Sequence, residues 1–402
     1  MDVLASPPAL SYPDGGQQTP AALQAIKQLV RLLLAREDAS RLQPLAPLPR
    51  AGPSLLASLG ELPAVDLLAT IRRQRLECLL HADPYVAELL PALWPSLQHL
   101  ARRETMAALA LASLTREISS LLEHAEIPVL VIKGVPLALQ TTSSIASRGR
   151  GDLDLFVDPS DVPHTVAVLQ AAGFHVFAAS DLGFIDASLL GRCCRWWYNE
   201  IKLIRHEGNA VQIIDLHWSL DYIYKDLPSF RQSYAKRSSV LIRETSIATL
   251  NQPNTFQHAC AHAAKDNWKY LRNLVDIHRL ARILGQDQLE PLQRYSYVRS
   301  TCVVTHDLTG LPLQMPPWLL QTTPYERIDR RARIYQSWDL IQPSPNRSFT
   351  LGSLLRFRSL LIVEGFDCSW VGLMGLLNKL ARIILPSKVL LELAAGRHKM
   401  PM

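Results

Sequence analysis

The spacing of apolar residues predicts helices in the first third of the chain. Residues 21–37 and 64–126 carry apolar side chains three and four positions apart, which is the repeat of an amphipathic helix. A proline-rich stretch over 44–53 separates these segments, and residues 1–20 combine prolines and glycines with few large apolar groups. The pattern predicts a disordered tail over 1–20 and an N-terminal helical region over 21–126.

The pattern changes at residue 127. Residues 127–132 are a short apolar run rich in β-branched side chains, and the run ends abruptly at Lys133 and Gly134, as a buried strand does. Pro136 is tolerated in the first turn of a helix, so a helix is expected to begin just after Gly134. A loop with two glycines then leads into a second predicted strand that ends at Val157.

Short segments of both kinds continue to about residue 220. The pattern predicts a helix over 160–172 closed by Gly173, a strand over 174–178, and two strands over 195–205 and 210–218. Residues 206–209 suit the turn of a hairpin between the last two strands.

These elements predict an α+β fold. A small mixed β-sheet forms a core over 127–220, between the N-terminal helical region and a C-terminal helical region over 221–402, in which proline-rich stretches at 311–317 and 343–345 interrupt the helices. The length of 402 residues exceeds one typical domain, which agrees with a catalytic core that carries helical additions.

Charge and cysteine usage narrow the class of protein. The 42 basic and 36 acidic residues leave a net charge of +6, which suits phosphate-bearing ligands without giving a strong nucleic-acid signal. The six cysteines form no CxxC pair, and the N-terminus has no signal-peptide pattern, so a cytoplasmic location is expected. Apolar runs such as 351–363, which contains Arg356 and Arg358, are too interrupted for a transmembrane segment.

Two carboxylates stand two residues apart on the second predicted strand. Asp152 and Asp154 therefore project from the same face, while Leu153 and Leu155 face the core. Two close carboxylates repel each other, and a bound divalent cation removes that penalty; hard oxygen ligands suit Mg²⁺ or Mn²⁺. The alternative is a solvated strand face that carries two acids.

A third carboxylate supports the metal site. Asp215 lies inside the predicted strand 210–218, where an acid without a partner would be unfavourable. If the two strands are neighbours in one sheet, Asp215 comes to lie beside Asp152 and Asp154. Three carboxylates can hold one or two metal ions that bridge phosphates and activate an attacking oxygen.

The turn after the first strand offers a phosphate contact. Gly134 permits a close backbone approach, amide groups at a helix N-terminus point at an anion, and Lys133 or Arg148 adds positive charge. An ordinary strand-to-helix turn has the same pattern. The turn therefore indicates a phosphate contact only in combination with the three acids.

Together these motifs resemble a known family. The order of an apolar strand, a glycine at a helix start, a DxD strand and a later strand with one aspartate is similar to the nucleotidyltransferase superfamily typified by DNA polymerase beta. Residues 130–138, 148–157 and 214–218 resemble more narrowly the bacterial NTP_transf_5 branch. A histidine- and tryptophan-rich helix of that branch is similar to the region that holds His258, His262, Trp268, Leu271 and Asp276.

The resemblance implies a metal-dependent transfer of an NMP from an NTP, such as ATP, with release of pyrophosphate. Asp152, Asp154 and Asp215 would be the catalytic metal ligands for Mg²⁺ or Mn²⁺, and Asp215 would also serve as the base. Lys133, Gly134 and Arg148 would bind the nucleotide phosphates. The acceptor hydroxyl would belong to a small molecule, peptide or protein, and the presence of relatives among natural-product biosynthesis genes agrees with such acceptors.

Val135 departs from the wider superfamily, in which a serine often follows the glycine and its hydroxyl touches phosphate. The histidines leave alternatives open. His258 and His262 have a spacing that can bind zinc, but no further ligand completes such a site, so packing or substrate contact by His262 or Lys265 is favoured. His217 shares the face of Asp215 and either lines the cleft or is a buried core histidine.

An aromatic run adds one more expectation. Trp196, Trp197 and Tyr198 are expected to pack in the core or between domains rather than to stack on bases.

Two other functions compete with nucleotidyl transfer. A DxD-type glycosyltransferase also holds a metal and a nucleotide, but a larger alternating α/β array would be expected before its acids. A non-catalytic nucleotide-binding scaffold has no need for an uncompensated cluster of three carboxylates.

Overall fold

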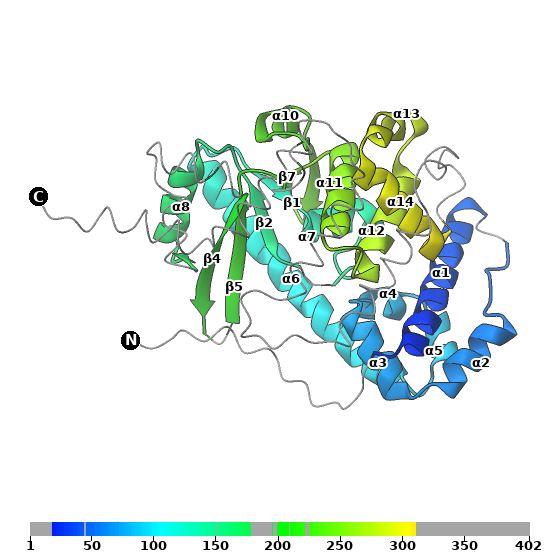
Figure 1. Ribbon diagram of the computed structural model, residues 1–402. Helices are drawn as coiled ribbons and strands as arrows, with labels where there is room; N and C mark the ends of the chain where they lie inside the picture. The colour runs from blue at the N-terminus through cyan, green and yellow to red at the C-terminus, as the bar shows by residue number, and fades with distance from the viewer. Residues whose placement is uncertain are drawn as a thin grey trace, which may run out of the picture.

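A computed structural model of the chain describes residues 18–43, 46–149, 151–177, 195, 199–208, 210–221, 224 and 226–310. Helices surround a five-stranded sheet, which lies at one side of the molecule in Figure 1. The N-terminal helices are α1 (Pro20–Leu42), α2 (Pro53–Glu61), α3 (Ala64–Arg73), α4 (Glu77–Ala82), α5 (Tyr85–Leu89) and α6 (Trp94–His124). The helical N-terminal region predicted from the apolar spacing is thus present.

The five-stranded sheet is mixed. Its members are β1 (Leu130–Ile132), β2 (Leu153–Phe156), β3 (His175–Val176), β4 (Glu200–Glu207) and β5 (Ala210–His217). The spatial order is β1-β2-β5-β4-β3, in which β2 and β5 are parallel and the other neighbours are antiparallel. The helices between these strands are α7 (Gly134–Thr142) and α8 (Val162–Ala171). This is the α+β fold, with its small mixed sheet, that the sequence predicts.

Helices cover one face of the sheet. Alternate residues of the strands, among them Leu153, Leu155, Ile214 and Leu216, are buried in one apolar cluster with side chains of α6 and α8. The intervening residues of β2 and β5 point to the opposite face because successive side chains of a strand alternate. The acids predicted as metal ligands belong to that opposite face.

A second core joins the two ends of the described chain. The remaining helices are α10 (Phe230–Ala235), α11 (Gln252–Lys265), α12 (Leu271–Ile283), α13 (Gln286–Leu289), the 3₁₀ helix η2 (Glu290–Arg294) and α14 (Ser296–Thr309). Buried residues of α1 and α3 share one apolar cluster with those of α11, α12 and α14. In Figure 1, α1 accordingly lies beside α14 although the two are far apart in sequence.

The structure differs from the expected elements at two places. A hairpin of β6 (Ser238–Ile242) and β7 (Thr245–Thr249) lies where helices were expected to dominate. The strand expected to start at residue 195 begins at Glu200 instead, and Arg195 has helical backbone geometry.

Several expectations concern residues outside the described ranges. These are the aromatic run Trp196, Trp197 and Tyr198, most of the tail 1–20, and the chain from 311 onward with its proline-rich stretches and the apolar run 351–363. Cys78, Cys260 and Cys302 are buried free thiols. Among the described helices, no single one is long and apolar enough to cross a membrane, and the bent pair α2 and α3 meets that test only when the two are taken together.

Candidate active site

Strands β2 and β5 bring the three predicted acids to one pocket. Asp154 and Asp215 are direct register partners on these parallel strands, and Asp152 stands immediately before β2. All three line a pocket of about 360 Å³. The side-by-side arrangement follows from the sheet order, which places the DxD strand next to the strand with the third aspartate.

Two lysines face the paired acids. The Lys133 ammonium lies 3.0 Å from Asp154 Oδ1, and the Lys202 ammonium lies 2.6 Å from Asp215 Oδ1. Burial alone would raise the pKa of Asp154, but Lys133 and His217 outweigh burial and hold it well below the usual range. Burial raises the pKa of Asp215, and the neighbouring Asp154 carboxylate adds to the rise despite the bond from Lys202. The pKa values of Asp154 and Asp215 are therefore shifted in opposite directions.

The turn at Gly134 packs directly against the DxD segment. Gly134 has a φ of +50°, and a Cβ built on it would lie 2.9 Å from the Asp152 carbonyl oxygen. A Cβ on Gly151 would lie 3.4 Å from the Gly134 Cα, an ordinary contact, so the requirement for glycine falls on Gly134. Glycine is thus required for contact between two backbones, and this contact places the first turn of α7 beside Asp152.

Arg148 lies at the edge of the same pocket. Its Nε donates to Asp276 Oδ2 on α12 at 2.9 Å, and both side chains are almost completely buried. This ion pair ties the loop before β2 to the C-terminal helices. It also brings together Arg148 and Asp276, two of the residues that carry the sequence resemblance.

His217 is a buried histidine beneath the acids. It is 2% exposed; its Nε2 lies 3.1 Å from Asp154 Oδ1 and its Nδ1 lies 3.1 Å from Glu200 Oε2. The ring thus links two carboxylates and fixes the orientation of Asp154. Burial would raise the pKa of Glu200, but His217 and Lys265 outweigh it and lower that pKa.

Helix α11 supplies the opposite wall of the pocket. His258, His262 and Lys265 all line it, and Lys265 Nζ lies 3.0 Å from Asp221 Oδ2. Burial, together with the positive charge of Lys133, lowers the pKa of His258 to about 3, so this ring is neutral at physiological pH. The centroids of the His258 and His262 rings are 6.5 Å apart.

Four site residues were not anticipated from the sequence: Lys202, Glu200, Arg75 and Arg272. The sequence contains a signal for Lys202 and Glu200. In a hairpin that turns near residue 208, Lys202 stands opposite Asp215 and Glu200 opposite His217, as the register of β4 and β5 has them. Arg75 and Arg272 belong to the helical regions, and no local pattern connects them with the acids.

The donor set has the chemistry of a divalent-cation site. Three carboxylates line one pocket, and oxygen ligands are those that Mg²⁺ and Mn²⁺ prefer. As the side chains stand, no three His, Cys, Asp or Glu groups among the described residues converge closely enough to hold an ion. Lys133 and Lys202 instead neutralise two of the acids, so a cation has to replace these ammonium groups as the counter-charge.

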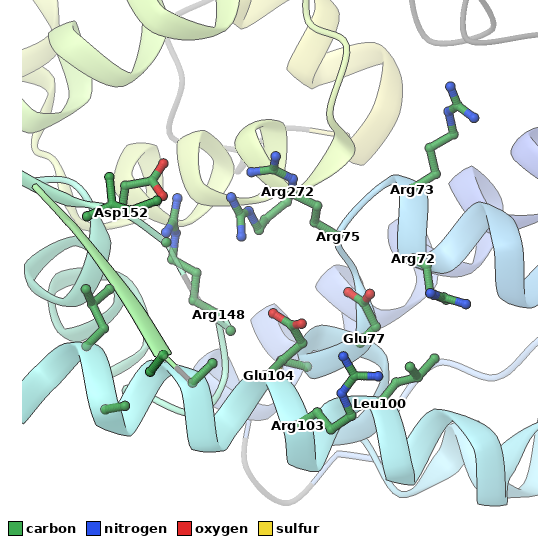
Figure 2. Close-up of a pocket in the computed structure, with 18 of the residues that line it drawn as sticks. Arg72, Arg73, Arg75, Glu77, Leu100, Arg103, Glu104, Arg148, Asp152 and Arg272 are labelled. Carbon is green, nitrogen blue, oxygen red and sulfur yellow. The ribbon is translucent and has the colours of Figure 1, made fainter. Parts of the chain in front are cut away.

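A larger cleft opens beside the pocket. It has a volume of about 1140 Å³ and shares Asp152, Gly151 and Arg148 with the pocket (Figure 2). Glu77 and Glu104 lie further along it. Burial, together with the neighbouring Glu104, raises the pKa of Glu77 to about 7.

The fold and the site define the class of protein as nucleotidyltransferase-like: a mixed sheet carries a DxD pair next to a third aspartate, beside a glycine turn that starts a helix. Residues 62–294, more than half of the chain, match the family model described as "Uncharacterised nucleotidyltransferase", NTP_transf_5. The chain belongs to this family, which confirms the resemblance stated from the sequence motifs.

Other comparisons find little. One similar solved structure is that of an antigenic nucleotidyltransferase-like protein from Paracoccidioides brasiliensis, with 11% sequence identity and a TM-score of 0.31. The match covers 49% of this chain and 91% of that protein. No curated protein matches the sequence.

Proposed function

We propose that this protein is a metal-dependent nucleotidyltransferase that moves an NMP from an NTP to a hydroxyl group of a small-molecule, peptide or protein acceptor. The observation that carries the proposal is the register pairing of Asp154 with Asp215, in a pocket that Asp152 and Gly134 also line. Membership of a nucleotidyltransferase family supports the transfer reaction itself.

The three acids have separate roles. Asp152 and Asp154 hold Mg²⁺ or Mn²⁺, and Asp215 completes the ligand set. When bound, the divalent cation supplies positive charge that offsets the charge of the phosphates and of the acids. His217 keeps Asp154 in place, since its Nε2 contacts Asp154 while its Nδ1 contacts Glu200.

In the reaction, the acceptor oxygen forms a bond to the α-phosphorus of the NTP. The bond between that phosphorus and the oxygen bridging to the β-phosphorus breaks, and pyrophosphate leaves with the electron pair. Asp215 takes the proton of the acceptor hydroxyl. Asp215 is the register partner of Asp154, which places its carboxylate beside the reacting groups.

The nucleotide phosphates contact the turn between β1 and α7. Lys133 and Gly134 at the start of α7 line the pocket together with Arg148, and the amides of a helix N-terminus favour an anion. Lys133 now pairs with Asp154, so it is available to phosphate once a cation takes over that carboxylate. His262 and Lys265 on the opposite wall contact the remainder of the substrate.

The larger cleft accommodates the body of the acceptor, while the acceptor hydroxyl approaches the α-phosphorus from the side opposite the leaving pyrophosphate. The cleft's volume of about 1140 Å³ is ample for a small molecule or a peptide segment, and Asp152 forms part of its wall. Its lining combines charged groups with apolar residues of α6 such as Leu100, Ala107 and Leu111, which suits an acceptor with both polar and apolar parts.

A labelling experiment tests the proposal. The protein is incubated with each labelled NTP, Mg²⁺ or Mn²⁺, and a cell extract, and the acceptor is the molecule that gains the label. The variant with Asp152→Asn and Asp154→Asn should lose transfer by at least about a hundredfold while remaining folded. The matched control carries Asp161→Asn and Asp287→Asn, which remove the same two charges outside the pocket.

Two results would contradict the proposal. Equal labelling by the two double variants would show that Asp152 and Asp154 are not the metal site. Failure of the unaltered protein to bind any NTP in the presence of Mg²⁺ or Mn²⁺ would exclude the enzymatic function.

A further inference from the structure

Three arginines from distant parts of the chain meet where the nucleotide pocket opens into the larger cleft. Arg75 follows α3, Arg148 precedes β2 and Arg272 belongs to α12, and all three line both cavities. Figure 2 shows them together near Asp152. The junction therefore has a concentration of positive charge directly beside one of the catalytic acids.

The three guanidinium groups are close enough to affect one another. Burial, together with the positive charges of Arg148 and Arg75, lowers the pKa of Arg272 to about 9, although Asp276 and Glu77 act in the opposite direction. Like charges gathered in a partly desolvated place disfavour one another. An anion bound between them would remove this repulsion, so the arrangement favours a ligand with several negative charges.

Contacts outside the cluster hold two of the three side chains and the backbone next to the third. Arg148 is fixed by its ion pair with Asp276 at 2.9 Å, and the Arg75 guanidinium lies 4.5 Å from the centre of the Tyr270 ring. The backbone amide of Leu271 donates to Gln74 Oε1 at 3.0 Å, which joins the residue before Arg75 to the residue before Arg272. The cluster is thus organised before any ligand arrives.

We propose that Arg75, Arg148 and Arg272 form one site that binds the β- and γ-phosphates of the NTP and holds the pyrophosphate as it leaves. This inference rests on the proposed function and adds Arg75 and Arg272 to it. The planar guanidinium group donates two parallel hydrogen bonds to phosphate oxygens, which makes arginine well suited to such a ligand.

The site also gives the substrate an orientation. With the β- and γ-phosphates at the junction, the α-phosphate lies toward Asp152 and Asp154, and the nucleoside lies along α11 near Ala259 and His262. Arg75 comes from the N-terminal helical region and Arg272 from the C-terminal one, so the phosphate site is complete only when these two regions pack against each other.

Binding of inorganic pyrophosphate tests the site without catalysis. Calorimetric titration in the absence of divalent metal should give an affinity about tenfold weaker for Arg75→Gln, since one charged hydrogen-bonding group is lost. Arg272→Gln should show at least the same loss. Arg231→Gln is the matched control, because its side chain is 83% exposed and lies outside both cavities, and its affinity should stay within about twofold.

A second measurement separates phosphate recognition from a general structural effect. In Arg75→Gln the affinity for NTP with Mg²⁺ should fall about tenfold, while the affinity for the corresponding NMP should fall less than about twofold. Because Arg75 is exposed, its replacement leaves the fold intact. Equal losses for NTP and NMP, or pyrophosphate affinities of Arg75→Gln and Arg231→Gln that agree, would overturn the inference.

The two proposals fail in different ways. Full transfer activity in the double variant with Asp152→Asn and Asp154→Asn would contradict the proposed function and leave the arginine site standing. If transfer depends on these acids but pyrophosphate binding is unchanged in Arg75→Gln, the arginine site is contradicted and the proposed function stands.

Discussion

The carboxyl group of Glu77 has a pKa well above that of an ordinary glutamate. Its side chain is buried in the first turn of α4, at the wall of the large cleft, and burial together with Glu104 raises its pKa from 4.5 to about 7. The nearby Arg272 and Arg72 only partly offset this rise. A carboxyl group that is still partly protonated at neutral pH makes folding depend on pH.

The expected pH dependence follows from the direction of the shift. Below pH 4.5 Glu77 is protonated in both folded and unfolded chains; as the pH rises toward 7, only the unfolded chain ionises, so stability is lost. The side chain in Glu77→Gln cannot ionise. The free energy of unfolding of this variant should therefore exceed that of the unaltered protein by up to about 3 kcal/mol at pH 8.5, and the two should agree at pH 4.5. Urea unfolding at both pH values measures this, and a difference that does not change with pH would contradict it.

At the scale of elements, one turn controls the position of the DxD strand. The turn between β1 and α7 contains two successive residues with positive φ, Lys133 at +62° and Gly134 at +50°. Gly134 also contacts the Asp152 backbone, so strain and a close approach coincide there. The elements on both sides of the turn depend on this residue being glycine.

Gly134→Ala should destabilise the protein by about 2–4 kcal/mol, because the new Cβ meets the Asp152 carbonyl oxygen at 2.9 Å in addition to the strain of its φ. Gly208→Ala isolates the strain: its φ is +57° and nothing lies within 4 Å of the added Cβ, so about 1 kcal/mol is expected. Equal losses for the two variants in urea unfolding would show that the contact with Asp152 has no energetic weight.

At the scale of the whole molecule, ion pairs join the first and last parts of the described chain. Glu37 on α1 accepts hydrogen bonds from Arg279 and Arg282 on α12, and the adjacent Asp38 contacts Arg282 and His278. Burial alone would raise the pKa of Glu37, but the two arginines outweigh burial and lower it. These contacts fasten α1 over the core that it shares with α11, α12 and α14.

Glu37→Ala should destabilise the whole protein by about 2 kcal/mol, because it leaves Arg279 and Arg282, which are largely buried, without this counter-charge. Arg41→Ala is the control, since Arg41 is 47% exposed and its Nη2 lies 3.9 Å from Glu37 Oε1, and its effect should stay within about 0.5 kcal/mol. Thermal unfolding of both variants measures the difference in Tm. Similar shifts in Tm would contradict a special role for the α1 to α12 contacts.

The sequence by itself determined the local elements and the acids. Apolar spacing predicted the N-terminal helices and the strands of the sheet, because the repeat of buried side chains is a local property. It missed β6 and β7, whose strands are only five residues long and whose turn, Arg243 and Glu244, lacks the glycine or asparagine that usually marks a hairpin. The same-face placement of Asp152 and Asp154 followed from strand periodicity alone.

Only the tertiary structure decided which charges meet. The pairs of Lys133 with Asp154 and of Lys202 with Asp215 depend on the order of strands in the sheet, and the cluster of Arg75, Arg148 and Arg272 depends on how two helical regions pack against it. Such contacts can join residues about two hundred positions apart or more, as the bond from Leu271 to Gln74 illustrates, and no local pattern specifies them. Periodicity fixes the direction of a side chain along its own element, whereas long-range packing selects its partner.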